Sequence, residues 1–267
     1  SINNKWNSIL EKECKKYKID FLTSPYDLSY VDLVNKYIPA FKIGSGDITW
    51  REILIKIAKK NKPLILATGA SNYTDVDKAV QLLRRYNKKI ILMQCNTNYT
   101  GEEKNFNYIN LRVLNLYKKK FKDKIVLGLS DHTPGHATVL GAVTLGARAI
   151  EKHFTDSNDR NGPDHKFALN PEDWKNMVVE TRRLEKSLGN GLKTVENNEN
   201  KSFYVQRRGV YLTKKLKKGH ILKKEDMVCL RPFVKNSISP FEINKFLGKK
   251  IKKNLSKNSI LNQKWIS

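Results

Sequence analysis

The stretch FKIGSGDITW, residues 41–50, decides the fold class of this chain. Two apolar residues flank Lys42 before the run opens into Gly44-Ser45-Gly46 and ends on Asp47. This order is typical of a buried parallel strand that ends in a loop of small residues, where the backbone can approach a ligand closely. A lysine in an apolar strand is costly unless an anion faces it. The segment alone leaves a second interpretation open, a plain glycine turn with a solvated lysine.

The same order of apolar run, polar residues and amphipathic pattern recurs along the chain. It predicts six strands, with apolar cores at residues 21–22, 41–43, 64–66, 90–93, 125–129 and 149–150. Between them, apolar residues have helical spacing, as at residues 53–58 and 76–83. Strands that alternate with helices indicate parallel βαβ units. An open α/β sheet accommodates six strands, whereas a (β/α)8 barrel needs eight.

Polar side chains gather where these predicted strands end. In barrel enzymes the chemistry lies at the carboxyl ends of the strands. The convergence therefore favours an active site over a series of unrelated turns. The residues at or near these ends are Ser24, Lys42, Asp47, Thr68, Thr97, Ser130, His132 and His153.

Two histidines raise the question of a metal. His132 and His153 follow consecutive predicted strands, 21 residues apart, and neighbouring strands of a barrel can place two such imidazoles side by side. Two imidazoles with carboxylate and water form an open site suited to Mn²⁺, Co²⁺ or Mg²⁺. Their spacing is equally compatible with acid–base or hydrogen-bonding histidines.

The composition argues against two other classes of protein, those that bind nucleic acid and those that contact a membrane. The net charge is +25, and residues 201–267 hold 18 basic and only 3 acidic side chains. Such an excess can attract nucleic acid, but lysine dominates it and no RNA-binding aromatic motif or zinc-finger spacing accompanies it, so we expect no nucleic-acid partner. Three cysteines without paired spacing and no signal-like or membrane-length apolar run predict a cytoplasmic protein with reduced thiols and no membrane contact.

A change of pattern divides the chain. Gly189-Asn190-Gly191 ends a long helical pattern, and the polar run GLKTVENNENKS follows it. We therefore predict an α/β domain at residues 1–189, a linker at 190–203 and a small β-rich domain at 204–267. Within the small domain we expect strands at 209–212 and 227–230 and a short helix from Pro240 to Leu247.

Several motifs, in this order, resemble the sialic acid synthase family, whose members make N-acetylneuraminate, legionaminate and related nonulosonates. They are FKIGSGD, LATGAS, QCNTNYT, GLSDHTPGH, AIEKHFT and GPDHKFALNP. The run RRGVYLTKKLKKGHIL is similar to the antifreeze-like (SAF) domain that closes that family's chains. The resemblance covers nearly the whole sequence and implies a TIM-type (β/α)8 barrel followed by a SAF domain.

The resemblance implies condensation of phosphoenolpyruvate with an N-acetylmannosamine-type sugar, with release of phosphate. His132 and His153 match the family's ligands for a divalent metal, and Asp47 matches a glutamate that handles protons. Lys42, with Asp47 and Glu151, is placed in the catalytic group. The residues matched to substrate binding are Ser24, Lys42, Ser45, Thr68, Thr97, Tyr99, Ser130, Asp164 and Arg231. The resemblance also implies a domain-swapped homodimer in which Arg231 reaches the partner's site.

The chain departs from the family pattern in four places. Asp47 replaces a glutamate, Ala67 a serine of some members, and Thr97 a serine or asparagine. The family's first two barrel strands have no counterpart before Ser1, so we expect a fragment of a longer protein. A non-catalytic sugar-binding relative and a basic polyanion-binding protein remain as alternative functions.

Overall fold

The computed structural model describes residues 3–267, which divide after Asn190 into two compact units. The first unit is built on a five-stranded sheet in which every neighbouring pair is parallel and the strand order follows the chain. Its strands are β1 (Phe41–Ile43), β2 (Leu64–Ala67), β3 (Ile90–Cys95), β4 (Val126–Asp131) and β5 (Ala149–Lys152). The expected α/β class with a parallel sheet is thus confirmed.

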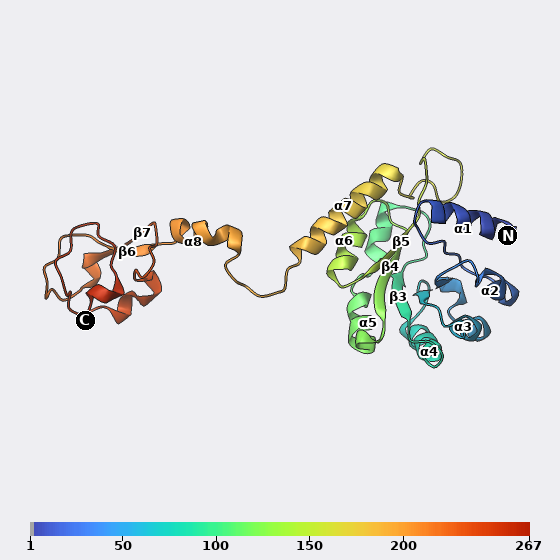
Figure 1. The fold of residues 1–267 in the computed structure, drawn as a ribbon, viewed down its shortest axis with the longest axis horizontal. Coiled ribbons are helices and arrows are strands. Elements are labelled where there is room, and N and C mark those ends of the chain that lie inside the picture. The colour runs from blue at the N-terminus through green and yellow to red at the C-terminus, as the bar shows by residue number, and fades with distance from the viewer. Residues whose placement is uncertain (1–2) are drawn as a thin grey trace. The chain divides into compact units, whose positions relative to one another are not determined.

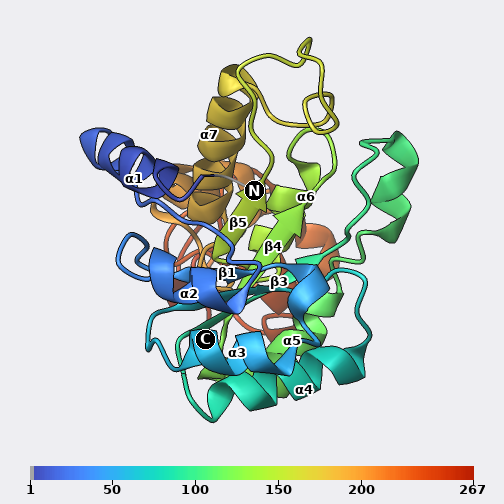
Figure 2. The ribbon, with the colours of Figure 1, turned by 90° about the vertical axis from the view of Figure 1, so that its right-hand side faces the viewer.

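Helices connect the strands and follow the curved sheet (Figures 1 and 2). Helix α4 begins with a capping box, because the Asn72 side chain accepts from the Asp75 N–H while the Asp75 carboxylate accepts from the Asn72 N–H. The helices of this unit are α1 (Trp6–Lys16), α2 (Leu28–Val34), α3 (Arg51–Ala58), α4 (Tyr73–Arg84), α5 (Val113–Phe121), α6 (Ala137–Thr144) and α7 (Pro171–Ser187).

One predicted strand is wrong. Residues 19–26 have neither helical nor strand structure in the described chain, so the expected strand at Phe21-Leu22 is absent there. Phe21 still packs against the core of the first unit. A run of two apolar residues can bury a side chain without the ladder hydrogen bonds that define a strand.

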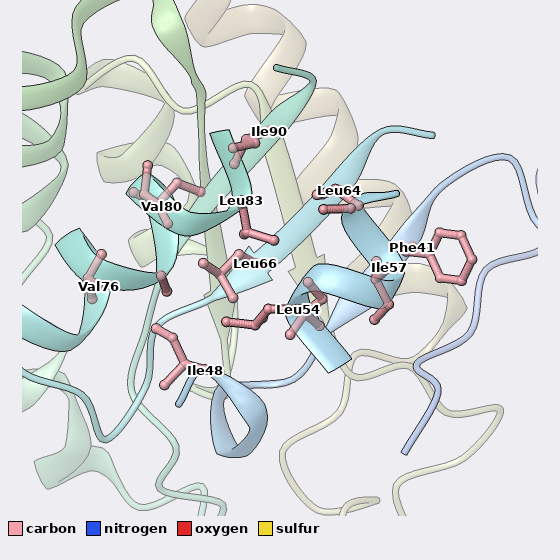
Figure 3. Packing of buried hydrophobic residues seen from close by; sticks show 14 of the residues in the cluster. Phe41, Ile48, Leu54, Ile57, Leu64, Leu66, Val76, Val80, Leu83 and Ile90 are labelled. Carbon is pink, nitrogen blue, oxygen red and sulfur yellow. The ribbon is translucent and has the colours of Figure 1, made fainter. Parts of the chain in front are cut away.

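The core explains why the expected helices form where they do. Helix α3 places Leu54 and Ile57 against Leu64 and Leu66 of β2, and all four are at most 1% exposed (Figure 3). Helix α4 adds Val76, Val80 and Leu83 at helical spacing. Each such side chain contributes about 1.5–3 kcal/mol by leaving water. This packing fixes the strands whose polar ends carry the candidate site.

Two strands run further than their apolar cores. β4 includes Ser130 and Asp131, and β5 includes Glu151 and Lys152. Their register pairs Ser130 with Glu151 and Asp131 with Lys152. Because successive side chains of a strand point to opposite faces, the first pair and the second pair lie on different sides of the sheet.

The second unit is small and held by short antiparallel contacts. β6 (Gly209–Leu212) pairs with β7 (Met227–Leu230), at the residues expected from the sequence. Isolated bridges such as Leu216 with Leu255 tie further segments to this hairpin. Nine buried apolar residues form its core. They are Val210, Leu212, Leu216, Leu222, Ile238, Ile251, Leu255, Leu261 and Ile266.

Two details of the second unit differ from expectation. The interval assigned to the linker ends inside helix α8 (Asn200–Gln206), because Phe203 and Tyr204 pack with Phe233 and give this polar stretch an apolar contact. The short helix expected at Pro240–Leu247 is a 3-10 helix over Pro240–Lys245. Within residues 3–267, no helix has the length and apolar character needed to cross a bilayer.

Candidate active site

Glu151 is the centre of the polar cluster at the strand ends. Its Oε1 accepts a hydrogen bond from Lys42 Nζ at 2.9 Å and another from Ser130 Oγ at 2.7 Å. The Lys42 side chain is 14% exposed, whereas that of Glu151 is 41% exposed. The lysine on the apolar strand therefore has the anionic partner that its burial requires. The carboxylate that provides it still faces solvent.

A tight turn of small residues adjoins this pair. The Gly69 N–H donates to Ser45 Oγ at 2.9 Å, which joins the ends of β1 and β2. A Cβ atom at Gly69 would lie 2.4 Å from Thr97 Cγ2, 3.0 Å from Cys95 Sγ and 3.1 Å from Ser45 Oγ. Any larger residue would displace these groups, so glycine is required for the close approach.

The Cys95 thiol lies inside the cluster and was missed by sequence reasoning. Cys95 is paired with Ser130 in the register of β3 and β4, and burial raises its pKa, so it remains a thiol at neutral pH. The sequence signal for Cys95 was its position two residues after the apolar run 90–93, where a strand was expected to end.

The two histidines come together as their spacing suggested. The ring centroids of His132 and His153 are 5.1 Å apart, and Tyr99 lies 4.3 Å from the His132 ring and 5.7 Å from the His153 ring. Phe167, 3% exposed, closes the other side at 5.0 Å from the His153 ring. Phe167 was not anticipated, although its motif GPDHKFALNP was singled out.

Hydrogen bonding orients the His132 ring. Its Nδ1 lies 2.8 Å from the carbonyl oxygen of Asn96, which only accepts, so Nδ1 carries the proton and Nε2 keeps a free lone pair. Burial lowers the pKa of His132, and the nearby His153 lowers it further. His132 is therefore a neutral imidazole with an available ligand atom at neutral pH.

Two carboxylates flank the cluster. Asp164 Oδ2 lies 3.4 Å from His153 Nδ1. Burial raises the pKa of Asp47, which makes this carboxyl a better proton carrier near neutral pH than an exposed aspartate. Tyr26, an exposed ring not foreseen from the sequence, approaches the same glycine as Asp47, because a Cβ atom at Gly44 would lie 3.9 Å from each side chain.

Three predicted site residues are not joined to this cluster by the contacts of the structure. Ser24 is half-buried in segment 19–26. The Thr68 hydroxyl donates to the Met93 carbonyl and accepts from Tyr117 OH, and Thr68 lines a hollow of about 470 Å³ beside α4 and α5 that Cys95 and Asn96 also line. Arg231 belongs to the second unit, where its Nε donates to the Gln206 carbonyl at 2.5 Å.

The residues at this site could hold a divalent ion only in an open site, in which the protein supplies some of the ligands and leaves the other positions to water or substrate. Among residues 3–267, no group of three or more His, Cys, Asp or Glu side chains is arranged as a ready set of metal ligands. The neighbouring imidazoles offer two ring nitrogens, and the carbonyl that fixes His132 is the usual outer partner of a ligating histidine. Water and substrate oxygens would complete the shell.

The parallel sheet and its strand-end cluster of amine, carboxylates, hydroxyls and imidazoles define an α/β protein with a site of the barrel-enzyme kind. Residues 1–193 match the NeuB family, and residues 207–264 match the SAF domain. The chain belongs to the NeuB family and carries a SAF domain, which confirms the resemblance seen in its motifs.

Relatives carry names that agree with this membership. An N,N'-diacetyllegionaminic acid synthase of Campylobacter jejuni is 38% identical over 253 residues, which are 93% of this chain and 74% of the relative. The crystal structure of a spore coat polysaccharide biosynthesis protein from Bacillus subtilis has a TM-score of 0.65 at 28% identity, covering 100% of this chain and 78% of that one.

A second similar solved structure is that of a protein named as a synthetase of N-acetylneuraminic acid. It is an N-acetylneuraminic acid synthetase from Leptospira borgpetersenii in complex with citrate, with a TM-score of 0.69 at 27% identity over 76% of this chain and 70% of that chain. Both solved relatives support the α/β architecture of the first unit.

Proposed function

We propose that this protein condenses phosphoenolpyruvate with an N-acetylmannosamine-type 2-acetamido sugar to give a nonulosonic acid and phosphate. Family membership and the name of the legionaminic acid synthase relative support the product class. The observation that carries the proposal is the Lys42–Glu151–Ser130 cluster. It offers an ammonium and a hydroxyl beside an exposed carboxylate at the ends of parallel strands.

Lys42, Ser45 and Ser130 are assigned to the anionic substrate. Phosphoenolpyruvate carries a carboxylate and a phosphate, and charge-assisted hydrogen bonds to such groups are about twice as strong as neutral ones. The Lys42 ammonium is only partly satisfied by one oxygen of Glu151 and keeps two donors for a ligand. Thr97, whose methyl carbon Cγ2 lies next to Gly69, is assigned to the same substrate.

The reaction requires one carbon–carbon bond and one hydration step. C3 of phosphoenolpyruvate attacks the aldehyde carbon of the sugar, whose oxygen becomes a hydroxyl by taking a proton. Water adds at C2 and loses a proton. The C2–O bond to phosphate then breaks as the new C2 hydroxyl gives up its proton and becomes the keto group. Asp47, with its raised pKa, is assigned to proton transfer, and Glu151 holds Lys42 in place and accepts from the sugar hydroxyls.

We assign His132 and His153 to a divalent ion, Mn²⁺, Mg²⁺ or Co²⁺. Such an ion would polarise the sugar aldehyde as a Lewis acid. Tyr99 packs on both imidazoles and Asp164 contacts His153, so these two side chains hold the rings and line the sugar side.

Product formation tests the proposal directly. The full-length protein is incubated with phosphoenolpyruvate, Mn²⁺ and either N-acetylmannosamine or a 2,4-diacetamido hexose, and products are identified by mass spectrometry while phosphate is measured. We expect a nine-carbon keto acid and one phosphate per product, both abolished in Lys42→Met. Binding of both substrates with no product at any metal concentration would instead identify a non-catalytic sugar-binding relative.

We further propose a homodimer in which Arg231 of one chain serves the sugar site of the other, because the planar guanidinium offers fixed donors to an N-acetyl carbonyl. Two inactive variants, His132→Ala and Arg231→Ala, are mixed. If Arg231 acts across the dimer, a mixed dimer regains one complete site. Absence of recovery, with subunit exchange shown by native mass spectrometry, contradicts it.

A further inference from the structure

A second polar cluster lies directly behind the first. Asp131 and Lys152 are paired across β4 and β5, their side chains are 0% and 1% exposed, and Lys152 Nζ contacts Asp131 Oδ2 at 2.6 Å. These residues alternate with Ser130 and Glu151, so they occupy the opposite face of the same two strands. The proposed reaction uses neither of them.

Further bonds connect this pair to the chain beyond both strands. Thr138 Oγ1, in the first turn of α6, donates to Asp131 Oδ2 at 2.6 Å, and Thr133 donates to Asp131 from its N–H and its hydroxyl. Lys152 Nζ also donates to the Thr133 carbonyl at 2.7 Å. One buried network therefore fixes the end of β4, the following turn, the start of α6 and the end of β5.

The network flanks both imidazoles. His132 lies between Asp131 and Thr133, so both its neighbours are held by the same bonds. His153 directly follows Lys152. The bonds of the network are made by the chain neighbours of the two rings, so the restraint acts on the backbone from which each ring projects.

We infer that the buried Asp131–Lys152 network is a positioning device that holds the His132 and His153 imidazoles side by side. Breaking a buried ion pair leaves an unpaired charge and disturbs its surroundings, whereas an apolar contact of similar size would only bring the two strands together. The expected effect on metal binding rests on the proposed function, because it requires the proposed metal site. The expected effect on the position of the two rings is independent of that site.

The first test follows His132 without any metal. Its Nδ1 proton, bonded to the Asn96 carbonyl, gives a downfield NMR resonance that reports the ring's position. In Lys152→Met and Asp131→Asn we expect this resonance to shift or disappear. Leu83→Ala, a core substitution in α4, controls for lost stability, and Asp32→Asn controls for charge at an exposed pair. Both controls should keep the wild-type resonance.

The second test measures Co²⁺ by its visible absorption spectrum. Loss of a group hydrogen-bonded to a ligating histidine typically changes metal affinity about 10- to 100-fold. Lys152 acts on the backbone beside the rings, so we expect Lys152→Met to weaken Co²⁺ binding by about 10-fold, the lower end of that range, with Lys152→Arg recovering part of it. If the single variants do not fold, Thr138→Val removes one bond of the network and serves for both measurements.

The outcomes separate the two ideas. A wild-type protein that binds no Co²⁺ contradicts the proposed metal site, and the NMR result then decides the positioning role alone. An unchanged His132 resonance in folded Lys152→Met or Thr138→Val overturns the inference. The same holds if Leu83→Ala shifts the resonance as much as Lys152→Met does.

Discussion

Glu151 in the first unit and Asp226 in the second are both carboxylates held by cations, and they differ in what remains open. The Asp226 side chain is 0% exposed. Its Oδ2 hydrogen-bonds with His220 at 2.7 Å and accepts from the Lys223 N–H, and its Oδ1 lies 2.8 Å from Lys214 Nζ in an ion pair. Glu151 is 41% exposed and receives Lys42 and Ser130 on a single oxygen. A closed cluster stabilises a fold, whereas a partly open cluster can exchange a partner for a ligand.

The largest expected effect concerns the independence of the two units. Leu92 of β3 is 0% exposed, and Leu92→Ala should destabilise the first unit by about 2–5 kcal/mol because it leaves a cavity. Hydrogen exchange measured along the chain should show faster exchange in β1–β5. Protection of β6 and β7 should not change.

The matched substitution in the second unit is Leu261→Ala, which removes another side chain that is 0% exposed. It should accelerate exchange in β6 and β7 and leave β1–β5 protected. Loss of protection in both units after either change would show that the two units unfold together as one cooperative structure.

The next effect tests the open cluster. Lys42→Met should weaken phosphoenolpyruvate binding about 10- to 100-fold, since a hydrogen bond to a charged group contributes roughly 1.5–3 kcal/mol. Isothermal titration calorimetry measures it. Lys60→Met, which removes a lysine paired with Asp32 at the surface, is the control and should bind normally. Equal affinity in wild type and Lys42→Met refutes the assignment of Lys42.

The closed cluster should respond to acid. Burial alone would raise the pKa of Asp226, but hydrogen bonds from Lys214 and His220 lower it from 3.8 to about 2. A carboxyl with a depressed folded pKa stabilises the native state above its unfolded pKa and loses this contribution as pH falls through the folded value. The stability of the second unit should therefore decrease between about pH 4 and pH 2.

Asp226→Asn is the control for this pH dependence. It should be less stable at pH 7 and should lose less stability over the same acid range, because the titrating carboxyl is gone. Urea unfolding at several pH values, followed by exchange of the β6 and β7 amides, gives both numbers. Parallel curves for wild type and variant would show that other groups cause the acid sensitivity.

The smallest expected effect concerns the N-terminal cap of α4, which forms between residues close in the sequence. Asn72→Ala removes the cap of α4 and should cost about 1 kcal/mol. Asn72→Asp should retain most of the stability, because its carboxylate also accepts from the Asp75 N–H. Thermal unfolding of the two variants measures the difference, and equal midpoints for Asn72→Ala and wild type would show that the cap is dispensable.

Sequence reasoning predicted five of the strands and failed at Phe21-Leu22. The length of the apolar run does not separate the two outcomes, because the run at residues 149–150 is equally short and forms β5 by pairing with β4. Sequence reasoning also located His132, His153, Lys42 and Ser45, whose types and spacing carry a chemical signal. Cys95 and the Asp131–Lys152 pair carry none in isolation. Their roles depend on neighbours 20 or more residues away.

The sequence by itself determined the alternation of strands and helices, the polar residues at the strand ends and the NeuB resemblance, because these follow from local periodicity and motif order. Only the tertiary structure decided which polar groups face one another. It paired Lys42 with Glu151 across 109 positions of the chain, turned Thr68 toward Tyr117 and buried Asp131 against Lys152. Register and strand alternation set these contacts, and both depend on the packing of the whole sheet.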